Sequence, residues 1–226
     1  LEFQKKCGYV LSIDVHPSQI IALTSDLKGE NCHLKEYPFQ KGDNLYKNLC
    51  QIIHDILPEY GDCHYRIVGI TIGIYGVVQQ NQILFTPYYP LPDSNLAKLL
   101  ESEFHIPVFV ENESNLSVLG ESAFHHYDQN MVLLNIHDGI GMGIMINGHD
   151  GYAGEIGHTI LFPDGKPCPC GNHGCLEQYA SEKAILEEYA RLTHQEQVTI
   201  DAFVRDYQNQ VPEALEMMEL FSTYIS

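Results

Sequence analysis

One histidine and three cysteines occur in a glycine- and proline-rich stretch, "GHTILFPDGKPCPCGNHGCLEQY" (157–179). They are His158, Cys168, Cys170 and Cys175. One nitrogen and three sulfur ligands suit a closed tetrahedral zinc site of the structural kind. The glycines of the loop allow the sharp bends that wrapping an ion requires. The stretch therefore predicts one structural Zn²⁺ per chain, held by these four side chains.

Other interpretations of the cysteines remain open. They could be free thiols or disulfide partners, although Cys168 and Cys170 are too close in sequence to pair comfortably. An acidic chain without a signal-like segment is expected in the cytoplasm, where disulfides are rare. His173, inside the loop, is a competing nitrogen ligand. The other cysteines are scattered and are interpreted as ordinary thiols: Cys7, Cys32, Cys50 and Cys63.

The composition limits the partners of the chain. A formal net charge of −18 repels phosphate backbones, so this segment should not bind nucleic acid by itself. A hydrophobic share of 44% over 226 residues suffices for one large domain or two small ones. No apolar run is long enough to cross a bilayer. The opening "LEFQKKCGYV" also lacks the long apolar stretch of a secretory signal.

Strand and helix patterns alternate along the chain. Strands are predicted over 9–15, 20–26, 66–74, 106–112, 131–137 and 139–148, and 28–39 is compatible with a further short strand. Helices are predicted over 44–57, 94–104, 113–124, about 175–190, 199–206 and 211–225. An early antiparallel run followed by this alternation indicates an α/β fold. The polar crossover "HHYDQN" (125–130) divides the chain into a first lobe over 1–124 and a second over 125–226, which contains the cysteine loop.

Four segments, in this order, resemble the ROK family, which is named for its repressors, uncharacterised members and sugar kinases: "VENESNLSVLGE", "GIGMGIMING", "GYAGEIGH" and "CPCGNHGCLEQYAS". The stretch "FTPYYPLPDSNLAKLLESEFHIPVFVENESN" is most similar to the xylose-repressor branch. The resemblance covers nearly the whole chain. It implies a two-lobed actin-like, sugar-kinase fold of the ribonuclease H-like kind, with sugar between the lobes and an incomplete second lobe.

The resemblance also implies sugar contacts. They are Asn112 and Glu113 at a helix start, Glu155 and His158 of "GEIGH", and Glu177 after the last cysteine of the loop. Carboxylates accept hydrogen bonds from hydroxyls, and amides both donate and accept. The zinc would then clamp the loop that carries Glu155 and Glu177. The plainer alternative is that Glu113 and Glu177 are solvated acids at helix starts that favour the helix dipole, and that Asn112 caps a helix.

Three departures from the family's kinases predict that this chain is not an enzyme and has no catalytic residue. Phosphoryl transfer needs backbone that cradles phosphate and an aligned base. Where the kinases carry a glycine-rich turn after the first strand, this chain reads "DVHPS" (14–18), and Pro17 lacks an N–H group. His137 and Asp138 replace the Gly-Thr of the second phosphate turn. Glu113 replaces the usual Asp and is one methylene longer.

The leading hypothesis is the effector-sensing domain of a transcriptional repressor, with xylose or glucose as the first guess for the sugar. A sugar kinase with an atypical nucleotide-binding turn and a ligand-free oligomerisation module are the alternatives. The resemblance implies a winged helix-turn-helix before Leu1 and a further C-terminal part after Ser226, neither of which this sequence contains. Operator DNA is therefore expected only through that helix-turn-helix. A homodimer or homotetramer is expected, with 175–190 and 211–225 as candidate interface helices.

Overall fold

The computed structural model describes residues 3–40, 42–90, 95–125 and 129–226. Contacts divide the chain into two compact units, Leu1–Leu116 and Ser117–Ser226. The division falls inside helix α3 (Glu113–His125), eight residues before the lobe boundary that the sequence predicts between 124 and 125. Part of the predicted crossover, 126–128, lies outside the described residues.

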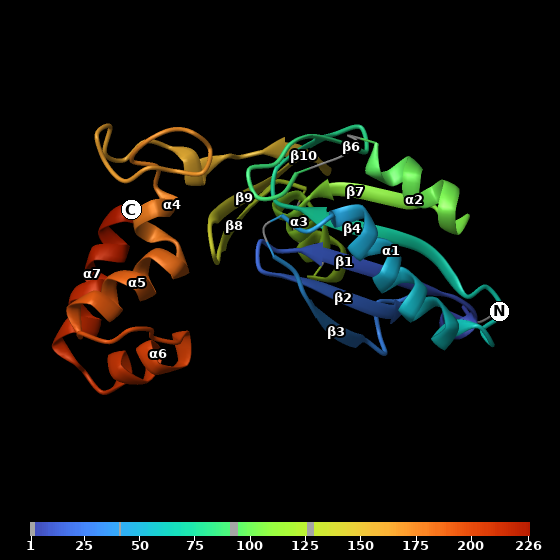
Figure 1. The fold of residues 1–226 in the computed structure, drawn as a ribbon, viewed down its shortest axis with the longest axis horizontal. Helices are drawn as coiled ribbons and strands as arrows, with labels where there is room; N and C mark the ends of the chain where they lie inside the picture. The colour runs from blue at the N-terminus through green and yellow to red at the C-terminus, as the bar shows by residue number, and fades with distance from the viewer. Residues whose placement is uncertain (1–2, 41, 91–94, 126–128) are drawn as a thin grey trace. The chain divides into compact units, whose positions relative to one another are not determined.

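A five-stranded mixed sheet forms the centre of the first unit, in the order β3-β2-β1-β4-β7 (Figure 1). Neighbours among β1, β2 and β3 are antiparallel, whereas β1, β4 and β7 run parallel. The carboxyl ends of these three parallel strands therefore meet at one edge, which is where open α/β sheets place ligands. The strands are β1 (Tyr9–Val15), β2 (Gln19–Asp26), β3 (His33–Pro38), β4 (Ile67–Ile74) and β7 (Val108–Asn112).

Two helices, α1 (Leu45–Ile56) and α2 (Leu96–Phe104), share one hydrophobic core with this sheet. Strand β1 buries every second side chain, Leu11, Ile13 and Val15, and α1 buries leucines and isoleucines at helical spacing. Burying one such side chain fully contributes roughly 1.5–3 kcal/mol. The core thus fixes β7, whose end carries the predicted site residues Asn112 and Glu113. Two short 3₁₀ turns complete this unit, η1 (Lys5–Cys7) and η2 (Leu57–Tyr60).

A two-stranded hairpin, β5 (Val77–Gln79) and β6 (Gln82–Phe85), is absent from the sequence prediction. Its strands are too short to show a clear alternation of polar and apolar residues. At its turn, Asn81 Nδ2 donates to Val108 O (2.9 Å) and Asn81 Oδ1 accepts from Val110 N (2.5 Å). The Asn81 amide thereby pairs with the backbone of β7, the strand at the end of the sheet order.

The second unit contains an antiparallel sheet in the order β10-β9-β8, followed by the cysteine loop and four helices (Figure 1). Strand β10 is a further element that the sequence prediction lacks. Of the helices in the described part of the chain, none has both the length and the apolar composition to cross a membrane. The elements are β8 (Met131–Ile136), β9 (Ile140–Ile146), β10 (His149–Ala153), η3 (Ile156–His158), α4 (Glu177–Ala180), α5 (Glu182–Leu192), α6 (Ile200–Gln208) and α7 (Pro212–Ile225).

The single helix predicted over about 175–190 is wrong. Ser181 separates α4 from α5 because its backbone is extended (φ −72°, ψ 158°). Its Oγ accepts a hydrogen bond from Ala184 N (3.1 Å) and so caps α5. A serine that satisfies the first N–H groups of a new helix competes with continuation of the old one.

Candidate functional site

The cysteine loop folds back on itself through backbone hydrogen bonds. Leu161 N and Phe162 N both donate to Gly174 O, and Gly174 N donates to Lys166 O (2.7 Å). Gly174 has φ +73°, and a Cβ there would lie 1.5 Å from Phe162 O. Only glycine fits this close approach of two backbone segments. The pairing brings the two ends of the loop, and the cysteines on them, together.

Four potential ligand atoms converge in this loop, from His158, Cys168, Cys170 and Cys175, and all lie within 4.8 Å of one another. Cys168 Sγ is 3.6 Å from His158 Nδ1, and Cys170 Sγ is 3.7 Å from Cys175 Sγ. The predicted ligand set is thus brought together and could hold a metal ion. His173, the alternative ligand, is exposed and does not belong to this group.

Two carboxylates lie next to the imidazole of His158. His158 Nε2 is 3.7 Å from Glu155 Oε2, and His158 Nδ1 is 3.7 Å from Glu177 Oε1. Glu177 is only 6% exposed, and its Oε1 accepts from Cys168 Sγ (3.0 Å) and Gln178 Nε2 (3.1 Å). Glu177 is therefore a neighbour of the cysteine cluster rather than a solvated acid at a helix start.

Burial raises the pKa of the Cys168 thiol, and its hydrogen bond to Glu177 raises it further. The protonated thiol is thus the favoured form where the thiol has only protein neighbours. A divalent cation within reach of the sulfur would reverse this preference, because coordination stabilises the thiolate.

In the first unit, Asn112 ends β7 and caps α3. Its Oδ1 accepts from Ser114 N (2.9 Å) and Asn115 N (3.2 Å). Its Nδ2 donates to Gly76 O (2.9 Å), at the base of the β5–β6 hairpin. The capping alternative is therefore observed, and the sugar contact of Asn112 stays a prediction.

Glu113 begins α3 beside Asn112. Its Oε1 accepts from Ser114 Oγ (2.6 Å). Burial raises the pKa of the Glu113 carboxyl, hydrogen bonds from Ser114 oppose this shift, and the Asp14 carboxylate adds to it. The net shift is upward, so this carboxyl is less readily ionised than a solvated glutamate.

The turn after β1 is occupied by a histidine side chain. His16 Nε2 lies 2.9 Å from Asp14 Oδ2, and His16 Nδ1 lies 3.0 Å from the Tyr75 hydroxyl. His16 N donates to Gln19 O (2.9 Å). Among the described residues, Asp14 Oδ1 is buried without a hydrogen-bond partner. Sequence reasoning singled out "DVHPS" but missed Tyr75, whose only signal is its place directly after the buried strand 66–74.

The predicted site residues thus form two groups. Glu155, His158 and Glu177 are brought together in the second unit around the cysteines, and Asn112 and Glu113 are neighbours in the first unit. The exposed His137 and Asp138 lie between β8 and β9, where His137 N donates to Gly139 O (3.0 Å).

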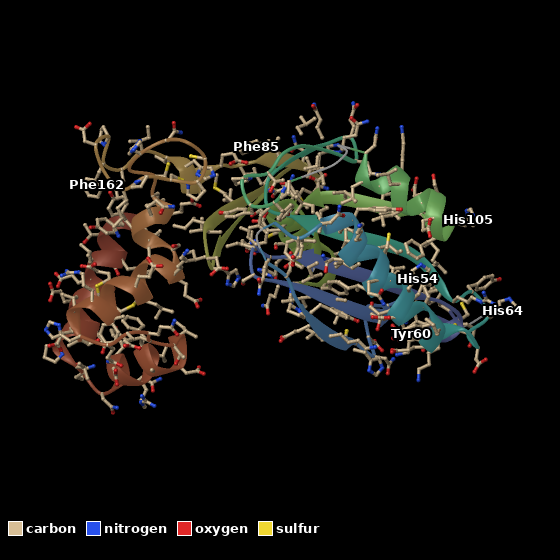
Figure 2. All side chains as sticks on the ribbon, viewed as in Figure 1. His54, Tyr60, His64, Phe85, His105 and Phe162 are labelled. Atoms are coloured by element: carbon tan, nitrogen blue, oxygen red, sulfur yellow. The ribbon has the colours of Figure 1, made fainter. Side chains whose placement is uncertain are left out.

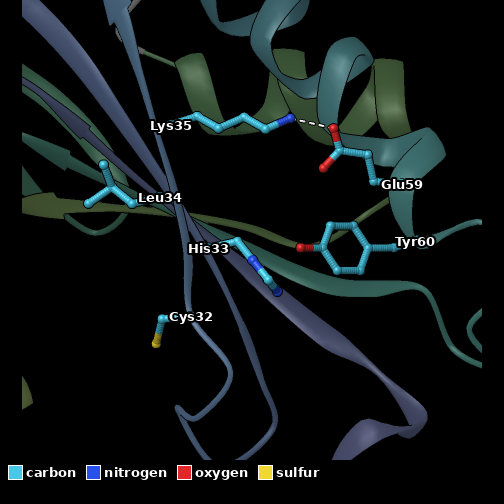
Figure 3. Close-up of a pocket in the computed structure, with 6 residues that line it drawn as sticks. All are labelled: Cys32, His33, Leu34, Lys35, Glu59 and Tyr60. Carbon is cyan, nitrogen blue, oxygen red and sulfur yellow. Dashed lines mark hydrogen bonds and ion pairs between the residues drawn. The ribbon is translucent and has the colours of Figure 1, made fainter.

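A cavity of about 510 Å³ lies beside strand β3 and contains none of the predicted site residues (Figure 3). Lys35 forms an ion pair with Glu59 across it, and the Tyr60 hydroxyl hydrogen bonds to Thr24 Oγ1. The Lys35, Glu59 and Tyr60 side chains are therefore already engaged with protein partners. It is lined by Cys32, His33, Leu34, Lys35, Glu59 and Tyr60.

Comparison with known protein families shows which family this chain belongs to. The ROK family model matches residues 10–226. This chain belongs to the ROK family. The resemblance seen in its motifs is thereby confirmed, including the similarity to the repressor branch. The chain is 36% identical over 202 residues to a xylose repressor of Bacillus spizizenii, which covers 83% of this chain and 51% of the repressor.

Glucokinases are also similar to part of this chain. The chain is 36% identical over 136 residues to a glucokinase of Streptomyces coelicolor, which covers 56% of this chain and 43% of the kinase. The chain thus spans about half the length of the curated relatives it matches.

Among solved structures, a ROK family transcriptional regulator described as a homologue of the Escherichia coli MLC protein is similar, with a TM-score of 0.83. Its sequence identity is 27%, and the match covers 99% of this chain and 62% of the regulator. The predicted α/β class and two-lobed actin-like fold are confirmed.

Proposed function

We propose that this chain is the effector-sensing part of a ROK transcriptional repressor, which binds a sugar without phosphorylating it. The turn after β1 carries the proposal. His16 N–H already donates to Gln19 O, and Pro17 has no N–H group. Backbone N–H groups are what a phosphate-binding turn offers, and neither of these two positions has one free for a phosphate. The similarity to xylose repressors supports the same proposal.

In this proposal the sugar hydroxyls contact Asn112, Glu113, Glu155, His158 and Glu177. The glutamates accept hydrogen bonds, and His158 and Asn112 can donate them. Xylose and glucose are the first candidates for the effector. The whole repressor would act in the cytoplasm as a homodimer or homotetramer and would bind operator DNA through a separate helix-turn-helix.

The cation of the cysteine cluster is Zn²⁺ in this proposal. A tetrahedral site with Zn–S bonds of about 2.3 Å and a Zn–N bond of about 2.0–2.1 Å has edges of about 3.8 Å between sulfurs and about 3.6 Å between sulfur and nitrogen. The observed 3.7 Å between Cys170 and Cys175, and 3.6 Å between Cys168 and His158, support this fit. The ion would be structural and would hold Glu155 and Glu177 in place.

A sugar kinase is the second candidate. The identity to glucokinase favours it, and so does Glu113, because a raised carboxyl pKa suits a general base. Calorimetry with xylose and glucose, together with an assay for ADP formation, separates the two functions. Heat of binding without ADP formation is expected, whereas sugar-dependent turnover of ATP would establish the kinase. If zinc-loaded protein gives no heat of binding and no thermal shift with these sugars, sugar sensing is rejected.

Glu155→Gln tests the site itself. It removes a charged acceptor and retains the shape of the side chain and all four cysteine-cluster residues. Loss of a hydrogen bond to a charged group should weaken sugar binding about ten- to hundredfold. Glu196→Gln, at an exposed position outside the predicted site, should leave affinity unchanged. Equal affinities for the two variants would remove Glu155 from the site.

A further inference from the structure

The side chain of Tyr179, on α4, connects the two halves of the cysteine loop. Its hydroxyl accepts a hydrogen bond from Lys166 N (2.7 Å), and Lys166 O accepts one from Gly174 N (2.7 Å). Lys166 lies two residues before Cys168, and Gly174 directly precedes Cys175. One hydroxyl therefore anchors a backbone pairing that places cysteines from both halves of the loop.

Further contacts hold the Tyr179 ring against the loop. A Cβ at Gly165 would lie 2.1 Å from the Tyr179 hydroxyl, so the loop needs a glycine there to let the hydroxyl approach. The Lys166 ammonium lies 5.2 Å from the centre of the Tyr179 ring, and Lys166 Nζ also donates to Gln178 O (3.2 Å). Lys166 thus contacts α4 through both its backbone and its side chain.

Tyr179 also contacts the last helix. Phe162 of the loop (labelled in Figure 2), Tyr179 of α4 and Tyr224 of α7 form an aromatic triad. The Tyr179 ring centre is 4.8 Å from that of Phe162 and 6.0 Å from that of Tyr224, with edge-to-face geometry. Such pairs contribute about 0.5–1.5 kcal/mol beyond the area they bury. The triad links the loop to the C-terminal turn of α7.

We propose that Tyr179 is a positioning residue for the metal centre and that, through the aromatic triad, ion binding also orders α7. This inference rests on the proposed zinc site. The hydroxyl acts through the backbone of Lys166, which sets where Cys168 and Cys175 lie. Residues that orient metal ligands in this way typically change metal affinity 10- to 100-fold when they are replaced.

Tyr179→Phe is the direct test, because it keeps the ring and the triad and removes the hydrogen-bond acceptor. Competition with a chelator should show Zn²⁺ affinity about 10- to 100-fold below that of the wild type. Tyr207→Phe is the matched control, because Tyr207 lies on α6 and is 39% exposed. The Zn²⁺ affinity of this variant should equal that of the wild type. Cys170→Ser should lose the ion.

Hydrogen exchange of the wild-type chain tests the link to α7. Chelation should accelerate exchange over 212–225, and Tyr224→Leu should reduce the zinc-dependent part of this protection. If the wild type holds about one Zn²⁺ and Tyr179→Phe binds it equally tightly, the positioning role is overturned while the zinc site stands. Exchange over 212–225 that is unchanged by chelation overturns the coupling to α7. A wild type that takes up no Zn²⁺ overturns the metal centre itself.

Discussion

Asn112 illustrates, at the scale of one residue, how a side chain that is predicted to contact a ligand can also serve the fold. Its Oδ1 satisfies two N–H groups of α3, and one of its two amide N–H bonds points to Gly76 O. Glu113, next in the chain, is different, because burial opposes its ionised form. Carboxyl groups whose ionised form is opposed by burial are frequent at functional sites. Such sites lower the stability of the folded protein.

Glu113→Gln should therefore stabilise the chain at neutral pH. The folded state raises the pKa of Glu113, so the folded chain binds this proton more tightly than the unfolded chain does. The free energy of unfolding therefore falls as pH rises from the usual glutamate pKa, which applies to the unfolded chain, to the raised pKa of the folded chain. We expect a gain in unfolding free energy at pH 7 that disappears on acidification below that window. Urea titrations from pH 4 to pH 8 measure it.

The exposed Glu36, changed to Gln, provides the control and should give no such pH-dependent gain. A Glu113→Gln variant that is less stable than the wild type at pH 7 would show that the ionised carboxylate stabilises the fold. Weaker sugar binding by the more stable variant would additionally support Glu113 as a sugar contact.

At the scale of elements, the β5–β6 hairpin is held against β7 at both of its ends. The Asn112 amide bonds to Gly76 at its base, and the Asn81 amide bonds to Val108 O and Val110 N at its turn. Asn81 adopts φ +65°, a left-handed conformation that asparagine tolerates. The hairpin exposes apolar side chains such as Phe85 (50%, labelled in Figure 2), so packing alone does not account for its position.

Asn81→Gly should destabilise the first unit by about 1–3 kcal/mol, because it leaves one donor and one acceptor of β7 without their partner. Glycine accepts the positive φ, so backbone strain does not contribute. Chemical denaturation measures the change. Gln80→Gly is a matched control at the neighbouring position, which also has a positive φ (50°) and is exposed, and it should be nearly neutral. If the two substitutions lower the unfolding free energy equally, the loss comes from the greater backbone freedom of glycine and not from the missing hydrogen bonds of Asn81.

At the scale of the whole chain, net charge limits which partners the chain can bind. The formal net charge is −18, and this chain spans about half the length of the curated relatives it matches. A repressor needs a surface that attracts the DNA backbone, and an acidic chain of this kind opposes it. In the proposed regulator, operator binding is therefore expected through residues other than these.

The chain by itself should not bind duplex DNA. Non-specific binders typically reach dissociation constants of about 10⁻⁴–10⁻⁶ M at physiological salt through phosphate contacts. We expect no binding in that range, even at low salt, because the net charge repels the duplex. Fluorescence anisotropy with a labelled duplex measures it, with a basic DNA-binding domain as the positive reference. Binding in that range that weakens steeply with salt would reveal a basic surface on this chain.

The sequence alone determined the features that depend on local spacing. His158, Cys168, Cys170 and Cys175 lie within eighteen residues, counted from His158 to Cys175, and their ligand types already indicate a metal site. Strands such as β1, β4 and β8 follow from runs of apolar and β-branched residues, because periodicity is a local property. The family motifs predicted the actin-like fold for the same reason, since each motif is a short stretch of adjacent residues.

Which distant side chains meet depends on how the elements of the folded chain pack together. His16 contacts Tyr75, Asn81 pairs with β7, and Tyr179 holds Lys166 and the last helix. Each contact joins residues from different elements, and its partner depends on how those elements pack. Burial, likewise, is a property of the packed chain, and it decided that Glu177 faces the cysteines and that the Glu113 pKa is raised. Periodicity along the chain carries no information on such pairs, because hydrogen bonds and desolvation act through space.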